Sequence, residues 1–219
     1  MVRILILLIA FNLTSIFFSS HTSIFAAEVT KAGGKADWVL VNDESGIKVF
    51  ERWVDEGKNT KVKERSGKMT LNCSIDDIIN VISDVSKTHV WMSYVEKSNV
   101  LKRSNENEWF VYTLLNAPWP FGRQDMVSKY QVIRDDSKHS ARILITRDMN
   151  LYPKQKGIDR LDTFNAYWEL SAGENNTVNV TFTTKSTEPP KYPAWIQDPV
   201  VRKVFLSNLE HLKDYLAKA

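Results

Sequence analysis

Most of this chain consists of short strand-like segments that follow one another with only brief turns between them. These segments are rich in β-branched and aromatic residues, and clusters of Ser, Asn, Asp, Gly or Pro separate them. The strands are predicted at residues 95–102, 108–115, 124–134, 141–147, 161–171 and 177–186. Consecutive strands with short connections pair antiparallel, because a parallel pair needs a long crossover. The sequence therefore predicts an antiparallel meander.

Two more strands and a helix are predicted upstream of the meander. Ile47–Val54 alternates apolar and polar residues, and Lys61–Leu71 is a second, more polar strand. Ser74 can cap a helix over Ile75–Val85, whose first turn holds acidic residues that suit the helix dipole. A short turn that contains Trp91 follows this helix.

The chain is predicted to close with an amphipathic helix. Asp198 followed by Pro199 indicates its start, with Asp as the N-cap and Pro at the first helical position. The apolar residues that follow form one stripe: Val201, Val204, Phe205, Leu209, Leu212 and Leu216. A sheet of about eight strands must bury this stripe. The predicted class is therefore α+β, with a curved antiparallel sheet wrapped around the terminal helix and either a packed core or a hollow between them.

The segment Pro118–Asp125 is a rigid corner between two predicted strands. Each of its prolines fixes φ and lacks the N–H that a central strand donates to its neighbour. The corner also carries the large aromatic residues Trp119 and Phe121. We expect these rings to pack inward, and we expect Arg123 to brace the corner by pairing with Asp125.

The N-terminus is typical of a secretory signal peptide. Arg3 precedes an apolar run over Ile4–Phe18, which is short for a membrane-spanning helix of roughly 20 residues. Residues 1–27 are predicted to be the signal, 28–36 a linker and 37–219 the domain. The protein is thus expected to be exported, to the periplasm or the medium. The sequence leaves open whether the N-terminal segment is cleaved or kept as a membrane anchor.

Composition and motifs exclude several classes of function. The formal net charge of +3 is small and dispersed, so no nucleic-acid partner is expected. The four histidines lack the spacing of metal ligands, and no nucleophile elbow or phosphate-binding glycine loop is present. A single cysteine, Cys73, allows no internal disulfide. We therefore expect no metal, no cofactor and no enzymatic activity.

Several segments resemble, in the right order, the motifs of START domains, the steroidogenic-acute-regulatory-related lipid-transfer family. The corner and the following Asp125-Met126-Val127 resemble the family's Pro-Trp-Pro…Arg-Asp-x-Val signature. The other matching segments are Trp38, Gly46–Phe50, Trp91, Pro153–Arg160, Trp168 and Pro189–Trp195. The resemblance extends over Asp37–Leu216. It departs from the family pattern at Gln124, where the family has arginine, and at Lys191, where it has glycine.

The resemblance implies a helix-grip fold of the START/Bet v 1-like kind, whose cavity holds a single lipid or similar hydrophobic ligand. It implies a monomer that contacts membranes transiently and that opens at the terminal helix and a neighbouring loop. The candidate ligand contacts on the terminal helix are Trp195, Ile196, Val201, Phe205 and Leu209, and those on the strands are Trp168 and Phe182. Either group could instead fill a solid core.

Polar residues on the strands could orient the ligand's head group. The candidates are Tyr112, Tyr130, Arg142 and Arg160, and each could instead be a surface or salt-bridged side chain. The sequence does not place the buried acid–arginine pair that sterol-binding relatives carry. Two alternatives to lipid transfer remain open: a polyketide cyclase or aromatase, which shares the fold, and a module that senses a lipid and binds a partner protein.

Overall fold

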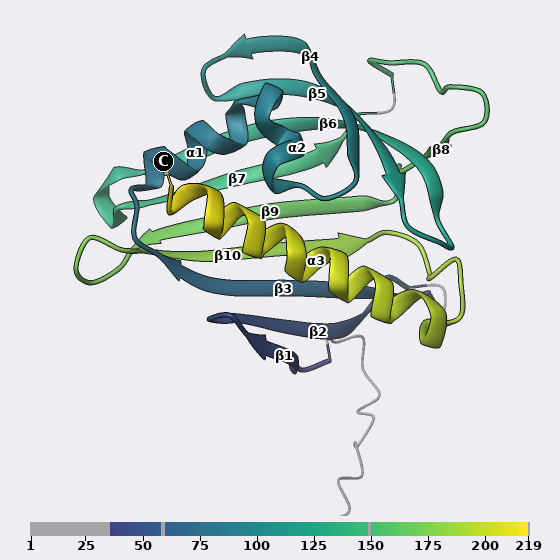
Figure 1. Cartoon of the computed structure of the whole chain (residues 1–219), viewed down its shortest axis with the longest axis horizontal. Coiled ribbons are helices and arrows are strands. Elements are labelled where there is room, and N and C mark those ends of the chain that lie inside the picture. Colours follow the sequence, from purple (N-terminus) through teal and green to yellow (C-terminus); the bar gives the residue numbers. More distant parts are fainter. Residues whose placement is uncertain (1–35, 58–59, 149, 219) are drawn as a thin grey trace, which may run out of the picture. The chain divides into compact units, whose positions relative to one another are not determined.

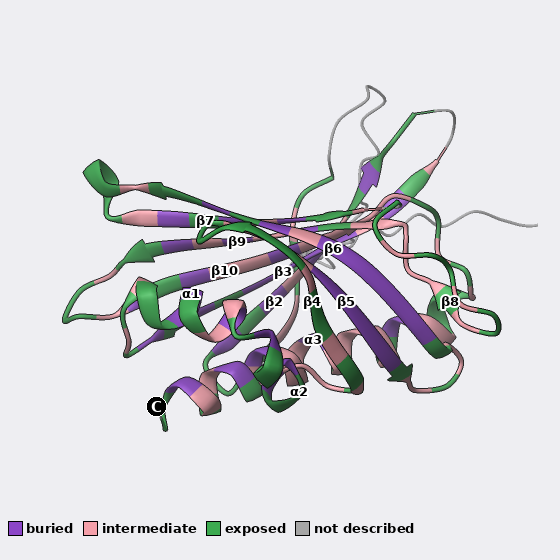
Figure 2. Ribbon diagram, turned by 90° about the horizontal axis from the view of Figure 1, so that it is seen from above, coloured by how far each residue is buried: buried purple, intermediate pink, exposed green. Residues whose placement is uncertain are grey.

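The computed structural model describes residues 36–57, 60–148 and 150–218, and it confirms the predicted class (Figure 1). A curved sheet is covered on one face by the helices, as the view from above shows (Figure 2). The strands are β1 (Val39–Glu44), β2 (Ile47–Asp55), β3 (Lys61–Leu71), β4 (Val95–Asn105), β5 (Glu108–Ala117), β6 (Gly122–Asp135), β7 (Ser140–Arg147), β8 (Asp159–Arg160), β9 (Phe164–Ala172) and β10 (Val178–Ser186). The helices are α1 (Ile75–Ser83), α2 (Thr88–Trp91) and α3 (Ala194–Leu216).

The strand order is β1-β2-β3-β10-β9-β7-β6-β5-β4, with antiparallel neighbours throughout. The meander β4–β10 thus folds back until β10 pairs with β3, which joins it to the N-terminal strands. The short strand β8 lies off this path and pairs parallel with β6. This pairing brings the long segment after β7 back to the end of β6.

The core lies between the concave face of the sheet and the helices. Along each strand every second side chain points to that face. Trp168 on β9 stacks on Phe182 of β10 with ring centroids 4.2 Å apart, and Phe182 stacks in turn on Phe205 of α3 at 5.5 Å. The C-terminal half of α3 therefore fills the grip with apolar side chains.

A glycine allows α3 to approach the sheet closely. A Cβ atom on Gly67 of β3 would overlap the side chain of Leu209 and lie 3.0 Å from Cε1 of Phe205. Both partners are buried core residues of α3. The missing side chain at residue 67 thus sets how deeply the helix lies on β3.

The predicted start of the terminal helix is wrong. The helix α3 begins at Ala194, with Pro193 as its N-cap, and Pro199 lies inside it. The carboxylate of Asp198 does not cap the helix, because it is buried in ion pairs with Lys63 and Arg65 of β3. A tertiary partner therefore overrode a local start signal.

Other boundaries also differ from the predictions. The strand predicted from residue 161 begins at Phe164, because Leu161 still donates its N–H to the carbonyl of Asp125 on β6. The helix predicted to Val85 ends at Ser83, although its predicted cap is confirmed as a capping box with Asp77. The turn around residue 91 is the short helix α2, and the strand β1 was not predicted.

The predicted signal segment, residues 1–27, lies outside the described residues, as does the linker apart from Ala36. Among the residues that the structure describes, no helix is long and apolar enough to cross a membrane.

The substitution Gly67→Ala tests the close approach of α3. We expect it to lower the free energy of unfolding by about 1–3 kcal/mol, because the added methyl group overpacks the contact with α3. Leu209→Ala alone should cost about 2–5 kcal/mol, since it leaves a cavity. The double variant should lose less than the sum of the two, because the new methyl group then has room. Urea unfolding measures all three, and strict additivity would contradict the overlap.

Candidate functional site

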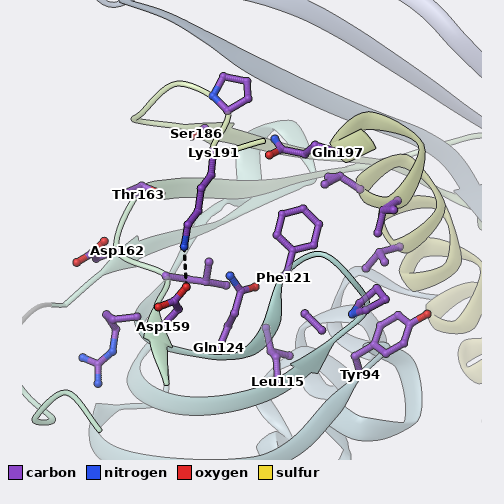
Figure 3. A pocket seen from close by; sticks show the side chains of 18 of the residues that line it. Tyr94, Leu115, Phe121, Gln124, Asp159, Asp162, Thr163, Ser186, Lys191 and Gln197 are labelled. Carbon is purple, nitrogen blue, oxygen red and sulfur yellow. Dashed lines mark hydrogen bonds and ion pairs between the residues drawn. The ribbon is translucent and has the colours of Figure 1, made fainter. Parts of the chain in front are cut away.

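A pocket of about 760 Å³ lies where the N-terminal half of α3 passes over one end of the sheet. It is bounded by the loop after α2, the ends of β5 and β10, the proline corner, β8 and the segment before α3 (Figure 3). The first half of α3 therefore covers a hollow, whereas its second half covers a packed core. A pocket of this volume is within the range that holds small organic ligands.

One wall of the pocket is apolar. The sheet contributes Leu115 from β5, the corner contributes Phe121, and α3 contributes Val200, Val201 and Val204. Side chains at these helix positions share the face that looks onto the sheet. The wall could therefore receive a hydrocarbon chain.

The opposite end of the pocket is polar, and its two lysines are paired with acidic residues. Lys191 forms an ion pair with Asp159 at 2.7 Å, and Lys154 forms one with Asp162 at 3.1 Å. Beside them Gln124 of β6 is buried, with only 8% of its surface exposed. Figure 3 shows its side chain directed into the pocket near Asp159.

A buried ion pair fixes this polar end. Arg160 of β8 donates to both carboxylate oxygens of Asp125, from Nε at 2.6 Å and from Nη2 at 3.0 Å. The two side chains are 2% and 0% exposed. Arg160 also donates to the carbonyls of Tyr152 and Pro153 at 3.1 Å each. The pair thus holds the segment that contains β8 against β6.

This pair corrects an expectation drawn from the sequence. Asp125 does not pair with Arg123, whose guanidinium instead binds Glu96 at 2.8 Å on the exposed surface. A buried carboxylate needs a buried partner, and only the chain returning at β8 supplies one. The buried partner of Asp125 is therefore Arg160.

The rim of the pocket is formed where the proline corner meets the segment before α3. The hydroxyl of Tyr192 donates to the carbonyl of Pro120 at 3.0 Å, and its ring packs edge-on against Phe121 at 5.6 Å. Two tryptophans next to this junction are the most exposed large apolar side chains described: Trp119 at 75% and Trp195 at 79%. Phe121 therefore packs inward as predicted, but Trp119 does not.

A cluster of charged residues fastens the same half of α3 to the sheet. Arg202 of α3 donates to both oxygens of Glu51 on β2, at 2.9 and 2.7 Å. Arg65 of β3 donates to Glu51 at 2.7 Å and to Asp198 of α3 at 3.1 Å. Lys63 completes this cluster, which we call the α3 anchor, by pairing with Asp198.

The α3 anchor holds Glu51 ionised. Burial by itself raises the pKa of the Glu51 carboxyl, but hydrogen bonds from Arg202 and Arg65 and the positive charges of Arg65 and Lys63 outweigh it. The pKa therefore falls from 4.5 to about 2. The ionised anchor is part of what positions the pocket half of α3.

The structure places the predicted ligand contacts in different surroundings. Arg160 and Val201 line the pocket. Phe205, Leu209, Trp168 and Phe182 belong to the apolar core beside it, Ile196 is half-buried, and Trp195 is exposed at its rim.

The other polar candidates do not line the pocket. Tyr130 is stacked on Trp109 in the core at 5.4 Å, and burial raises its pKa to about 12. Tyr112 packs on Tyr152 in a second apolar cluster that includes Val127. Arg142 is exposed and paired with Glu169 at 2.6 Å.

Several pocket residues were not among the predicted contacts. Leu115, Phe121, Val204 and Lys191 line the pocket, and Gln124 is its buried amide. Two features of the sequence could have pointed to these residues: the apolar content of the corner, and the departures from the family pattern at residues 124 and 191. In the described part of the chain, no group of three His, Cys, Asp or Glu side chains is arranged to hold a metal ion.

Known proteins resemble this chain over most of its length, although no family model matches it. It is 24% identical over 199 residues to an uncharacterized protein of Pseudomonas aeruginosa, which covers 90% of this chain and 96% of that protein. It is similar to the structure of a STAR-related lipid transfer protein from Xanthomonas axonopodis, with 26% identity, a TM-score of 0.72 and coverage of 82% of this chain and 98% of the other. The structure of human StAR-related lipid transfer protein 5 matches with a TM-score of 0.68 at 13% identity. This match covers 87% of this chain and 89% of the human chain.

A curved antiparallel sheet that grips a C-terminal helix, with a pocket between them, defines a helix-grip protein. Within this class, the ordered motifs and the similarity to the Xanthomonas protein make the chain similar to the STAR-related lipid transfer proteins. The Zhui aromatase/cyclase from a Streptomyces species shares the fold with a TM-score of 0.51. Its sequence identity is only 9%, so the similarity is one of fold alone.

The α3 anchor predicts a defined pH dependence of stability. Because folding lowers the pKa of Glu51 from 4.5 to about 2, its contribution is complete above pH 4.5 and is lost as the pH falls towards 2. Glu51→Gln should cost about 3 kcal/mol at neutral pH, since it leaves buried cations without a partner. This difference from the wild type should shrink as the pH falls through that window.

Urea unfolding at a series of pH values measures this difference. Glu169→Gln is the matched control, because it breaks the exposed pair with Arg142 and should change stability by less than about 1 kcal/mol. A gap between the wild type and Glu51→Gln that stays constant down to pH 2 would show that Glu51 is not held ionised.

Proposed function

We propose that this protein binds a single lipid or similar amphiphile in the pocket beneath α3, and that it transfers or senses that lipid without chemical change. The observation that carries the proposal is the pocket of about 760 Å³, which has an apolar wall along α3 and a polar end at β6 and β8. The Xanthomonas relative is named a lipid transfer protein, and this supports the same class of ligand here.

The driving force is the removal of a hydrocarbon chain from water. Each methylene group that enters an apolar site gains about 0.8 kcal/mol. Val201, Val204 and Leu115 supply such a site, whereas the polar end offers hydrogen-bonding groups to a head group. This arrangement binds and orients an amphiphile with no need for a reacting side chain, which favours binding over the cyclase alternative.

Membrane contact and export are part of the proposal. Trp119 and Trp195 project from the pocket rim, and tryptophan side chains favour the interface between a bilayer and water. Docking through these rings would place the pocket mouth at the membrane. The apolar run over Ile4–Phe18 supports export of the domain to the periplasm or medium.

Native mass spectrometry of the exported, purified protein tests the binding directly. We expect one lipid to co-purify or to be taken up from phospholipid vesicles, and the intact mass reports whether residues 1–27 have been removed. Val201→Trp should abolish uptake by filling the pocket, whereas Lys203→Trp, exposed on the same helix, should not. If the wild type neither carries nor acquires a lipid, the proposed function is wrong.

Membrane docking is tested by flotation with phospholipid vesicles. Trp119→Ala and Trp195→Ala should each weaken vesicle binding about tenfold, because each removes a large apolar side chain from the rim. Ile133→Ala is the control, since Ile133 is exposed on β6 outside the pocket. Equal loss in all three variants, or no loss in any, would rule out docking through the rim.

A further inference from the structure

Gln124 is a feature of the pocket that the binding of a hydrocarbon chain does not explain. Its strand register on β6 places it opposite Leu115 of β5 on one side and Asp159 of β8 on the other. It therefore lies at the boundary between the apolar wall and the polar end. Among the side chains drawn in Figure 3, no hydrogen bond or ion pair joins its amide to another.

The Gln124 side chain is mostly buried and is directed into the pocket, so a ligand that displaces water from the pocket must take over the hydrogen bonds of its amide. Burying such a group without a hydrogen bond is unfavourable, so buried polar groups are nearly always paired. An amide offers two donors and one acceptor oxygen at the same place. A ligand group beside Gln124 would therefore both accept and donate hydrogen bonds, as a hydroxyl or an amide does.

The charges around the pocket disfavour an anionic head group. The basic residues that line it are Lys154, Arg160 and Lys191, and each is paired with an acidic residue. Arg160 is occupied further, since it bonds Asp125 and two backbone carbonyls. A carboxylate or phosphate placed at Gln124 would lose its hydration and lie near Asp159 with no unpaired cation to replace the water.

We propose that Gln124 selects amphiphiles with an uncharged, hydrogen-bonding head group, and that the pocket discriminates against those with an anionic head group. This inference rests on the proposed function, because it assigns the head-group end of the same pocket. The hydrocarbon chain then runs along Leu115, Phe121 and α3, and the head group bonds the Gln124 amide.

Two amphiphiles with the same acyl chain test the selection: monoolein, whose glycerol head group is uncharged, and oleate at a pH at which it is ionised. Equal amounts are offered together to the full protein, and native mass spectrometry gives the ratio of the two complexes. The wild type should retain monoolein in at least about tenfold preference, and Gln124→Leu should weaken monoolein binding about tenfold. Gln124→Arg adds a cation at the same position and should reverse the preference.

Gln131→Leu is the matched control, because it makes the same change on the same strand but lies outside the pocket. Circular dichroism verifies that each variant is folded, and Gln124→Arg still reports on selectivity if Gln124→Leu does not fold. Equal or greater retention of oleate by the wild type, or an unchanged ratio in folded position-124 variants, would overturn the inference but leave lipid binding intact. If neither amphiphile nor any vesicle lipid binds, the proposed function fails together with it.

Discussion

The packing of α3 on the concave face of the sheet decides what the rest of this structure can do. Near its C-terminal half the helix lies directly on β3, because Gly67 leaves room for Phe205 and Leu209. Near its N-terminal half the helix, the corner, β8 and the segment before the helix line a pocket of about 760 Å³. The same helix therefore closes a solid core at one end and covers a binding site at the other.

The pocket half of α3 uses two sets of side chains for two purposes. Asp198 and Arg202, one turn apart, enter the α3 anchor and tie the helix to β2 and β3. Val201, which lies between these two residues in the sequence, and Val204, which follows them, line the pocket. The far rim is joined more weakly, by the hydrogen bond and ring contact of Tyr192 with the corner. Charged residues thus hold the helix on one flank, and the apolar residues remain available to a ligand on the other.

The sequence predicted the fold well because its local patterns agree with the tertiary structure. Alternating strands, short turns and an apolar stripe on the last helix are sufficient to predict an antiparallel sheet around a helix, and Ser74 caps α1 as its residue type indicates. The start of α3 was misplaced because Asp198-Pro199 has the local form of a helix start, whereas its carboxylate is taken by a strand far away in the chain.

The binding site was predicted less well, for a related reason. Alternation along a strand separates its two faces but does not say which face the helix covers, so Tyr112 was assigned to the wrong side. The pair Asp125–Arg160 depends on β8 returning to β6, and no local pattern indicates that pairing. Gln124 was noticed only as a departure from a family motif. Its burial beside the pocket became visible once the corner, β6 and β8 were placed together.

A crystal structure of the protein loaded with an amphiphile tests the central claim, that the hollow beneath the first half of α3 is the ligand site. The ligand's chain should lie between Leu115, Phe121 and Val201, with its head group within hydrogen-bonding distance of Gln124 and the Asp125–Arg160 pair intact. A ligand bound elsewhere on the protein, or a hollow closed by collapse of α3 onto the sheet, would contradict the account.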